Sequence, residues 1–146
     1  EAERVGVSAR YRPEDFAAHR RVVGNDWVAD ILEGDQCMQD DRFVEAALLY
    51  ASAAAILPGS PWGHYKQGKA LLAAGKSADA ADALLRAAEA APSFHLSRLY
   101  RAHALGAAGR YAEALADAEK AAALNPFERD AAKLAGVLRK TIRSQG

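Results

Sequence analysis

The chain has 146 residues, of which 51% are apolar and 26% charged, so it is long enough for one domain with a sizeable core. Its 19 basic and 19 acidic residues give a formal net charge of zero, which provides no overall attraction to nucleic acid or to an anionic membrane. Its apolar runs are too short to span a bilayer. We therefore expect partners other than nucleic acid and no membrane span.

The first element in chain order is a predicted helix over about residues 13–24. Pro13 suits a first helical turn, Glu14 and Asp15 interact favourably with the helix dipole there, and Gly24 can end the helix. We interpret residues 1–26 as a flanking segment whose helix caps the domain or is the degenerate second helix of an earlier unit. We expect residues 1–10 to be disordered.

From residue 27 onward the sequence repeats every 34 residues. Five columns keep this spacing: Pro58, Pro92 and Pro126; Ala46, Ala80 and Ala114; Ala53, Ala87 and Ala121; Gly34, Gly68 and Ala102; Cys37, Leu71 and Leu105. A shared period in five columns predicts three structural units, over residues 27–60, 61–94 and 95–128.

Each unit has the pattern of two helices. In the third unit, a first helix ends at the stretch from Gly106 to Gly109, where glycine can adopt the left-handed conformation. A second helix runs from Tyr111 to about Leu124 and ends before Pro126, which lacks an amide hydrogen. The small residues of the columns allow the two helices of a hairpin to approach closely.

These motifs resemble the tetratricopeptide repeat family, in a bacterial type, over residues 27–128. The resemblance implies an all-α fold, a right-handed superhelical solenoid of antiparallel hairpins. The sequence departs from the family where a large apolar residue is favoured early in the first helix, since Asp30, His64 and Arg98 occupy that column. Leucine is common three residues later, where this chain has Glu33, Gln67 and Arg101.

The last element, over residues 129–146, is a predicted capping helix from Arg129 to about Arg143. Its apolar face comprises Ala132, Ala135, Leu138 and Ile142, and we expect that face to cover the open end of the stack.

The residue types that carry catalysis or bind metals are scattered. His19, His64, His95 and His103 have no metal-ligand spacing, and Asp35, Asp40 and Asp41 do not match a calcium loop. Cys37 falls on the buried face of its helix, where it acts as a small apolar residue, and a single cysteine cannot form an internal disulfide. We predict no enzyme activity, no metal and no cofactor.

In the family that the chain resembles, the first helices line the concave side, which implies a peptide-binding groove. Its predicted residues are Val28, Ile31, Asp35, Trp62, Tyr65, Lys66, Lys69, Leu96, Leu99, Tyr100 and His103. Trp, Tyr and a nearby cation suit peptides with carboxylates or aromatic groups. In the alternative interpretation, Tyr65 and Leu99 pack between repeats and Trp62 covers a hairpin junction.

One branch of the family holds chaperone tails with a two-carboxylate clamp of Lys, Asn and Arg residues. The corresponding positions here are Ile31, Asp35, Lys66, Leu96 and Tyr100, of which only Lys66 fits, so a chaperone-tail adaptor is disfavoured.

The charged residues are distributed unevenly along the chain, with an acidic first unit and a basic last helix. This layout favours head-to-tail self-association or orients a partner along the groove, unless both faces are simply solvated.

The predicted function is a non-catalytic scaffold that binds a peptide segment of a partner protein. The chain does not begin with methionine, which indicates a removed leader or a piece of a longer protein. Two alternatives therefore stay open: a recognition arm of a larger enzyme such as a glycosyl- or sulfo-transferase, and a periplasmic assembly or secretion adaptor. The compartment is unknown, with the cytoplasm slightly favoured over the periplasm.

Overall fold

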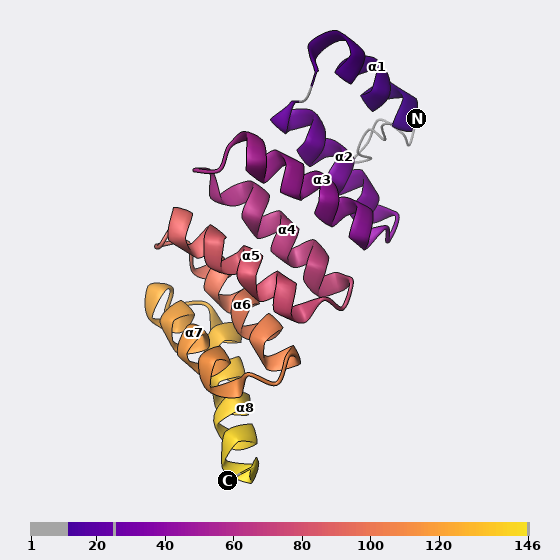
Figure 1. The fold of residues 1–146 in the computed structure, drawn as a ribbon. Helices are drawn as coiled ribbons and strands as arrows, with labels where there is room; N and C mark the ends of the chain where they lie inside the picture. Colours follow the sequence, from indigo (N-terminus) through magenta and orange to yellow (C-terminus); the bar gives the residue numbers. More distant parts are fainter. Residues whose placement is uncertain (1–11, 25, 146) are drawn as a thin grey trace, which may run out of the picture.

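The computed structural model describes residues 12–24 and 26–145, and our expectation for residues 1–10 lies outside this part of the chain. The described part contains eight helices and no strand (Figure 1). The helices are α1 (Pro13–Val23), α2 (Trp27–Gln39), α3 (Phe43–Ile56), α4 (Pro61–Ala73), α5 (Ser77–Ala90), α6 (His95–Ala107), α7 (Tyr111–Leu124) and α8 (Arg129–Gln145).

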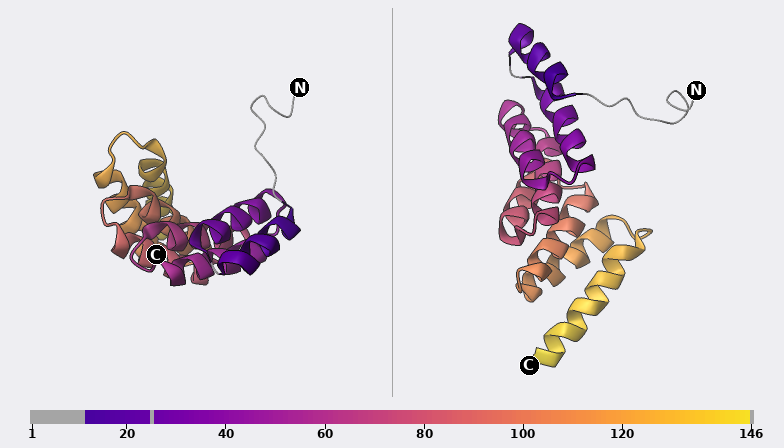
Figure 2. Two further views of the ribbon diagram at one scale, coloured as in Figure 1. Left: turned by 90° about the horizontal axis from the view of Figure 1, so that it is seen from above. Right: turned by 90° about the vertical axis from the view of Figure 1, so that its right-hand side faces the viewer.

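Successive helices pack in pairs and form a single row. The hairpins α2–α3, α4–α5 and α6–α7 follow one another, with α1 and α8 at opposite ends (Figure 1). The row is curved (Figure 2). The first helices α4 and α6 also contact each other, as do α6 and α8, so the first helices lie on the inner side of the curve. The all-α solenoid of helix pairs expected from the repeat is confirmed.

Each hairpin turns at a residue with positive φ. Gly75 and Gly109 have φ of 81° and 80°, and Asp41 takes the same place in the first hairpin with φ of 59°. These residues recur at the period of the repeat. Aspartate is one of the few residues besides glycine that tolerate this conformation.

Small residues allow the two helices of a hairpin to pack closely. A Cβ atom added to Gly34 would lie 2.5 Å from Tyr50 Cε1, and one added to Gly68 would lie 2.4 Å from Leu84 Cγ. Since carbon atoms in contact lie about 3.5–4.0 Å apart, these positions exclude any larger side chain. The two glycine positions therefore determine how close the helices come.

The charged residues that break the family pattern form buried or partly buried ion pairs. In the third hairpin, Asp117 is 3% exposed and lies 3.0 Å from Arg98 Nη1 and 2.5 Å from Arg101 Nη1. Arg101 also donates a hydrogen bond from Nε to the carbonyl oxygen of Ala81 at 3.3 Å. Arg101 of α6 thus links α7 with the main chain of α5, and Arg98 adds a second contact with α7.

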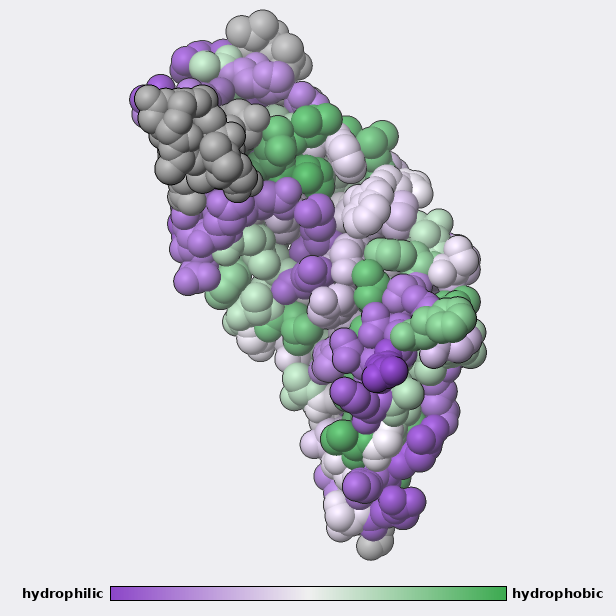
Figure 3. Space-filling view, turned by 180° about the vertical axis from the view of Figure 1, so that it is seen from behind, coloured by the Kyte–Doolittle hydropathy of each residue, from purple (hydrophilic) through white to green (hydrophobic). Residues whose placement is uncertain are grey.

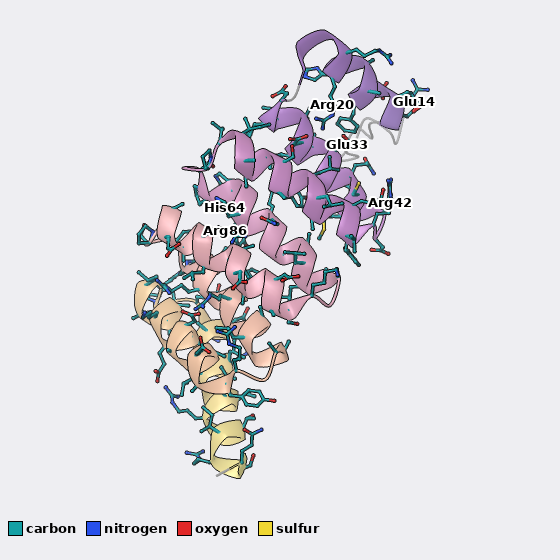
Figure 4. All side chains as sticks on the ribbon, in the orientation of Figure 1. Glu14, Arg20, Glu33, Arg42, His64 and Arg86 are labelled. Carbon is teal, nitrogen blue, oxygen red and sulfur yellow. The ribbon has the colours of Figure 1, made fainter. Side chains whose placement is uncertain are left out.

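At the other end, polar contacts hold α1 on α2. Arg20 Nη2 lies 2.5 Å from Asp30 Oδ1, whose side chain is 1% exposed, and 3.0 Å from Glu33 Oε1 (Figure 4). His19 Nε2 lies 2.8 Å from Asp26 Oδ2. The other oxygen of Asp26 accepts a hydrogen bond from the Val28 amide at 3.0 Å and caps α2.

The face that α8 presents to the stack matches our expectation at Ala135 and Leu138 and differs from it at Ala132. Ala131, Ala135 and Leu138 are buried, whereas Ala132 is exposed. Successive residues of a helix point about 100° apart, and the buried face begins one residue earlier than we predicted. Ala132 consequently faces away from α7.

Candidate functional site

The eleven predicted groove residues lie on the three first helices. On α2 they are Val28, Ile31 and Asp35; on α4, Trp62, Tyr65, Lys66 and Lys69; on α6, Leu96, Leu99, Tyr100 and His103. Figure 3 views the inner side of the curve, where apolar and hydrophilic patches alternate along the row. The side-chain contacts divide the residues into two connected groups and several separate ones.

The first group centres on Lys69. Its Nζ atom lies 5.0 Å from the ring centroid of Tyr100 and 5.4 Å from that of Tyr65, so two electron-rich ring faces attract the ammonium group. The two tyrosines are themselves in edge contact, with centroids 5.8 Å apart. Burial, followed by the proximity of Tyr100, raises the pKa of Tyr65 to about 12, so this ring stays neutral near pH 7.

Aromatic rings extend this group in both directions. Trp62 lies 6.0 Å from Tyr65, and Phe94, which directly precedes α6, lies 5.1 Å from Tyr65 and 5.6 Å from Trp62. His103 lies 6.2 Å from Tyr100. We call Trp62, Tyr65, Lys69, Phe94, Tyr100 and His103 the aromatic cluster. Trp62 is 48% exposed, which leaves much of its indole available for contact.

The second group joins α2, α3 and α4 through Asp35. The Tyr50 hydroxyl donates a hydrogen bond to Asp35 Oδ1 at 2.5 Å, and Lys66 Nζ lies 3.0 Å from the same oxygen. Burial, then the bond to Asp35, raises the pKa of Tyr50. Met38 and Lys69 complete a cavity of about 180 Å³ beside these residues. The charge of Lys66 is thereby compensated inside the protein.

The remaining predicted residues contribute less to this surface. Tyr65 and Leu99 are 6% and 5% exposed, and thus pack mainly between helices. Ile31 and Leu96 are half-buried against the core. Val28 is exposed but lies apart from both groups, in a second cavity of about 210 Å³ between α1 and α2.

Sequence reasoning missed Phe94, Tyr50 and Met38. Phe94 lies in the turn before α6, whereas the predicted groove residues all lie on helices. Tyr50 belongs to a second helix, yet it reaches the inner side through the space beside Gly34. Its place in the repeat signals packing, whereas its hydroxyl reaches a carboxylate on α2.

The described residues show no arrangement typical of metal or thiol chemistry. No group of three or more His, Cys, Asp or Glu side chains within 12–24 and 26–145 is placed to hold a metal ion. Cys37 is 3% exposed, and burial raises the pKa of its thiol. No helix in this part of the chain is long and apolar enough to cross a bilayer.

No protein-family model matches the sequence, and no curated protein matches it either. Solved structures do. The first tetratricopeptide repeat domain of Spaghetti (RPAP3), bound to an HSP90 peptide, matches with a TM-score of 0.76 at 19% identity, over 80% of this chain and 93% of that one. MamA matches with a TM-score of 0.82 at 16% identity, over 88% of this chain and 75% of that one.

The TPR2B domain of yeast Sti1, in a pHsp70 complex, matches with a TM-score of 0.73 at 21% identity, over 79% of this chain and 97% of that one. Identities this low establish similarity of fold. The period of the sequence, the paired helices and these structures agree that the chain has the tetratricopeptide-repeat fold.

Proposed function

We propose that this chain is a non-catalytic scaffold that binds a peptide segment of a partner protein on the inner side of its curve. The aromatic cluster is the centre of the site, and Lys69 is its key residue. The preferred peptide carries a carboxylate side chain next to an apolar or aromatic one.

The observation that carries the proposal is the environment of Lys69. No described carboxylate lies within ion-pair distance of its Nζ atom, whereas Lys66, one helical turn earlier, is paired with Asp35. Ring faces hold the ammonium group in place without neutralising it. A carboxylate of a bound peptide could form an ion pair with this ammonium group. A hydrogen bond to a charged group contributes about 1.5–3 kcal/mol.

Trp62 supplies the apolar half of the site. Its ring is half exposed and supported from behind by Tyr65 and Phe94. A large, rigid aromatic side chain of this kind contributes much contact area at a low cost in conformational entropy. A peptide side chain can stack on Trp62 while a neighbouring acid reaches Lys69.

The charges of the groove argue against a terminal carboxylate clamp of the chaperone type. Asp35 places a carboxylate at one of the positions that the resemblance assigns to the clamp, and it engages Lys66, the one suitable cation. A second carboxylate arriving there would meet like charge. The proposed ligand is therefore an internal peptide segment whose acid contacts Lys69.

The test is a selection of binding peptides from a random library on the wild-type protein, followed by fluorescence anisotropy on variants. Lys69→Met keeps the aliphatic stem between the tyrosines and removes the charge, and Trp62→Ala removes the stacking surface. Lys120→Met is the matched control, because Lys120 is exposed on α7, a second helix.

We expect Lys69→Met to weaken binding of acidic peptides by about tenfold or more, the equivalent of a charged hydrogen bond. Trp62→Ala should weaken all selected peptides, and Lys120→Met none. If the selected peptides bound the Lys69 and Trp62 variants as tightly as the wild type, the inner surface would not be the binding site.

A further inference from the structure

The last helix, α8, has the position and pattern of the first helix of a fourth hairpin. Gly136 lies one period after Ala102 in the column of Gly34 and Gly68. Cβ atoms added to Gly34 and Gly68 collide with the second helix of their hairpin, but one added to Gly136 meets no described atom within 4 Å apart from the nearby backbone of α8 itself. Among the described residues of one copy, nothing therefore covers the face of α8 that would hold a second helix.

The first helix, α1, has the complementary pattern of a second helix. Phe16 lies one period before Tyr50, in the column of large residues that fill the space beside the glycines. It packs at α2, and a cavity of about 210 Å³ lies beside it, lined also by Val28, Ala29 and Leu32. In the internal repeats, the preceding first helix lies at this place.

We propose that α8 of one copy packs against α1 and α2 of a second copy, so that α8 and the second α1 form a hairpin across two chains. The copies then join head to tail, and the period of the repeat continues from one chain into the next. The proposal is independent of the peptide-binding function.

Exposed apolar residues at the two ends occupy matching positions. Within the chain, first helices meet through pairs 31 residues apart: Lys66 contacts Asp35 at 3.0 Å, and Tyr100 contacts Lys69. Continuing the period across copies pairs Val137 of α8 with Leu32 of the second copy. Val137 is 59% exposed and Leu32 38% exposed in a single copy, and the contact would bury both.

The charges fit the same orientation. The two helices of a hairpin are antiparallel, so the end of α8 would lie beside the start of α1. Lys140 and Arg143, both exposed, would approach Glu14 and Asp15 in the first turn of α1. At the opposite end, Asp130 of α8 would approach the last turn of α1, which is basic.

A two-fold contact between two α8 helices is disfavoured by charge. This helix carries five basic residues and one acidic residue: Arg129, Lys133, Arg139, Lys140 and Arg143 against Asp130. Like charges on both partners would repel. A head-to-tail contact uses different surfaces on the two copies and leaves one of each free, so it adds further copies to form open chains.

Sedimentation velocity from micromolar to millimolar concentration tests the proposal on the full chain. We expect the mass of the wild type to rise with concentration, and to rise less at high salt because the charged contacts are screened. Gly136→Leu should stay monomeric, since the added side chain meets nothing in one copy but occupies the place of the second helix. The control Ala116→Leu adds a leucine on the exposed side of α7 and should associate like the wild type.

A mixing experiment separates head-to-tail from symmetric contact. Leu32→Lys alters the other surface and should also be monomeric alone. An equal mixture of Gly136→Leu and Leu32→Lys retains one intact copy of each surface and should form dimers that grow no further. A wild type that stays monomeric throughout, a Gly136→Leu variant that associates normally, or a mixture without dimers would each overturn the proposal.

Discussion

Replacing Gly68 by alanine measures how much the close approach of α4 and α5 contributes. The added Cβ would lie 2.4 Å from Leu84 Cγ and 2.7 Å from Cδ2, and Leu84 is 0% exposed, so it has no solvent-filled space to move into. Overpacking of this kind costs about 1–3 kcal/mol. Alanine in a helix interior is favoured over glycine by about 1 kcal/mol, which offsets part of that cost.

Gly136→Ala is the matched comparison, because Gly136 belongs to the same column and its added Cβ meets nothing. Both variants gain helix propensity, so the difference between their free energies of unfolding, about 1–3 kcal/mol, reports the steric conflict alone. Urea denaturation followed by circular dichroism, at dilute protein so that association does not contribute, gives both values. Equal stabilities for the two variants would refute the close packing of α4 on α5.

Two further predictions concern charged groups. Asp117→Ala leaves Arg98 and Arg101 partly buried without their carboxylate, and should lower the free energy of unfolding by about 3 kcal/mol in the same urea assay; a loss below about 1 kcal/mol would contradict a buried triad of this strength. The hydrogen bond from His19 lowers the pKa of Asp26 below its ordinary value of 3.8. The ionised Asp26 carboxylate therefore contributes fully to stability at a pH above its pKa in the unfolded chain. This contribution is lost as the pH falls through the lower pKa that Asp26 has in the folded chain. An NMR titration of the Asp26 carboxyl group should show the lowered pKa, and His19→Gln should raise it; an unchanged value would exclude the contact.

The architecture could be predicted because it depends on features that recur. Each hairpin requires a small residue where its two helices approach closely, which accounts for the column of Gly34. It also requires a residue that ends the second helix, which accounts for the column of Pro58. The second helix of the third unit was predicted from Tyr111 to about Leu124, which is where α7 begins and ends. Turn residues recur as well, although Asp41 replaces glycine in the first hairpin.

The site was harder to predict, because its contacts join different columns of the repeat, and the residue types in those columns change from one unit to the next. The position of Lys69 on a helical face gave no indication that Tyr100 of the next unit would share it, or that Phe94 would close the cluster. Burial also depends on neighbours: Leu99 has groove spacing, yet helices on both sides cover it. The contact of Asp117 with Arg98 and Arg101 could not be predicted from the repeat, because it occurs in the third unit only.

The arginine contacts of the third hairpin have a mechanical consequence. In a linear array of repeats, each unit is stabilised chiefly by its immediate neighbours, so local opening at one joint need not disturb the next. Arg101 spans two joints at once, holding a carboxylate on α7 and a main-chain carbonyl on α5. Bending between α5, α6 and α7 would stretch the contacts of this one guanidinium group. We therefore expect this half of the molecule to move as one stiff block. Most of the flexibility would then lie at the end that carries α1.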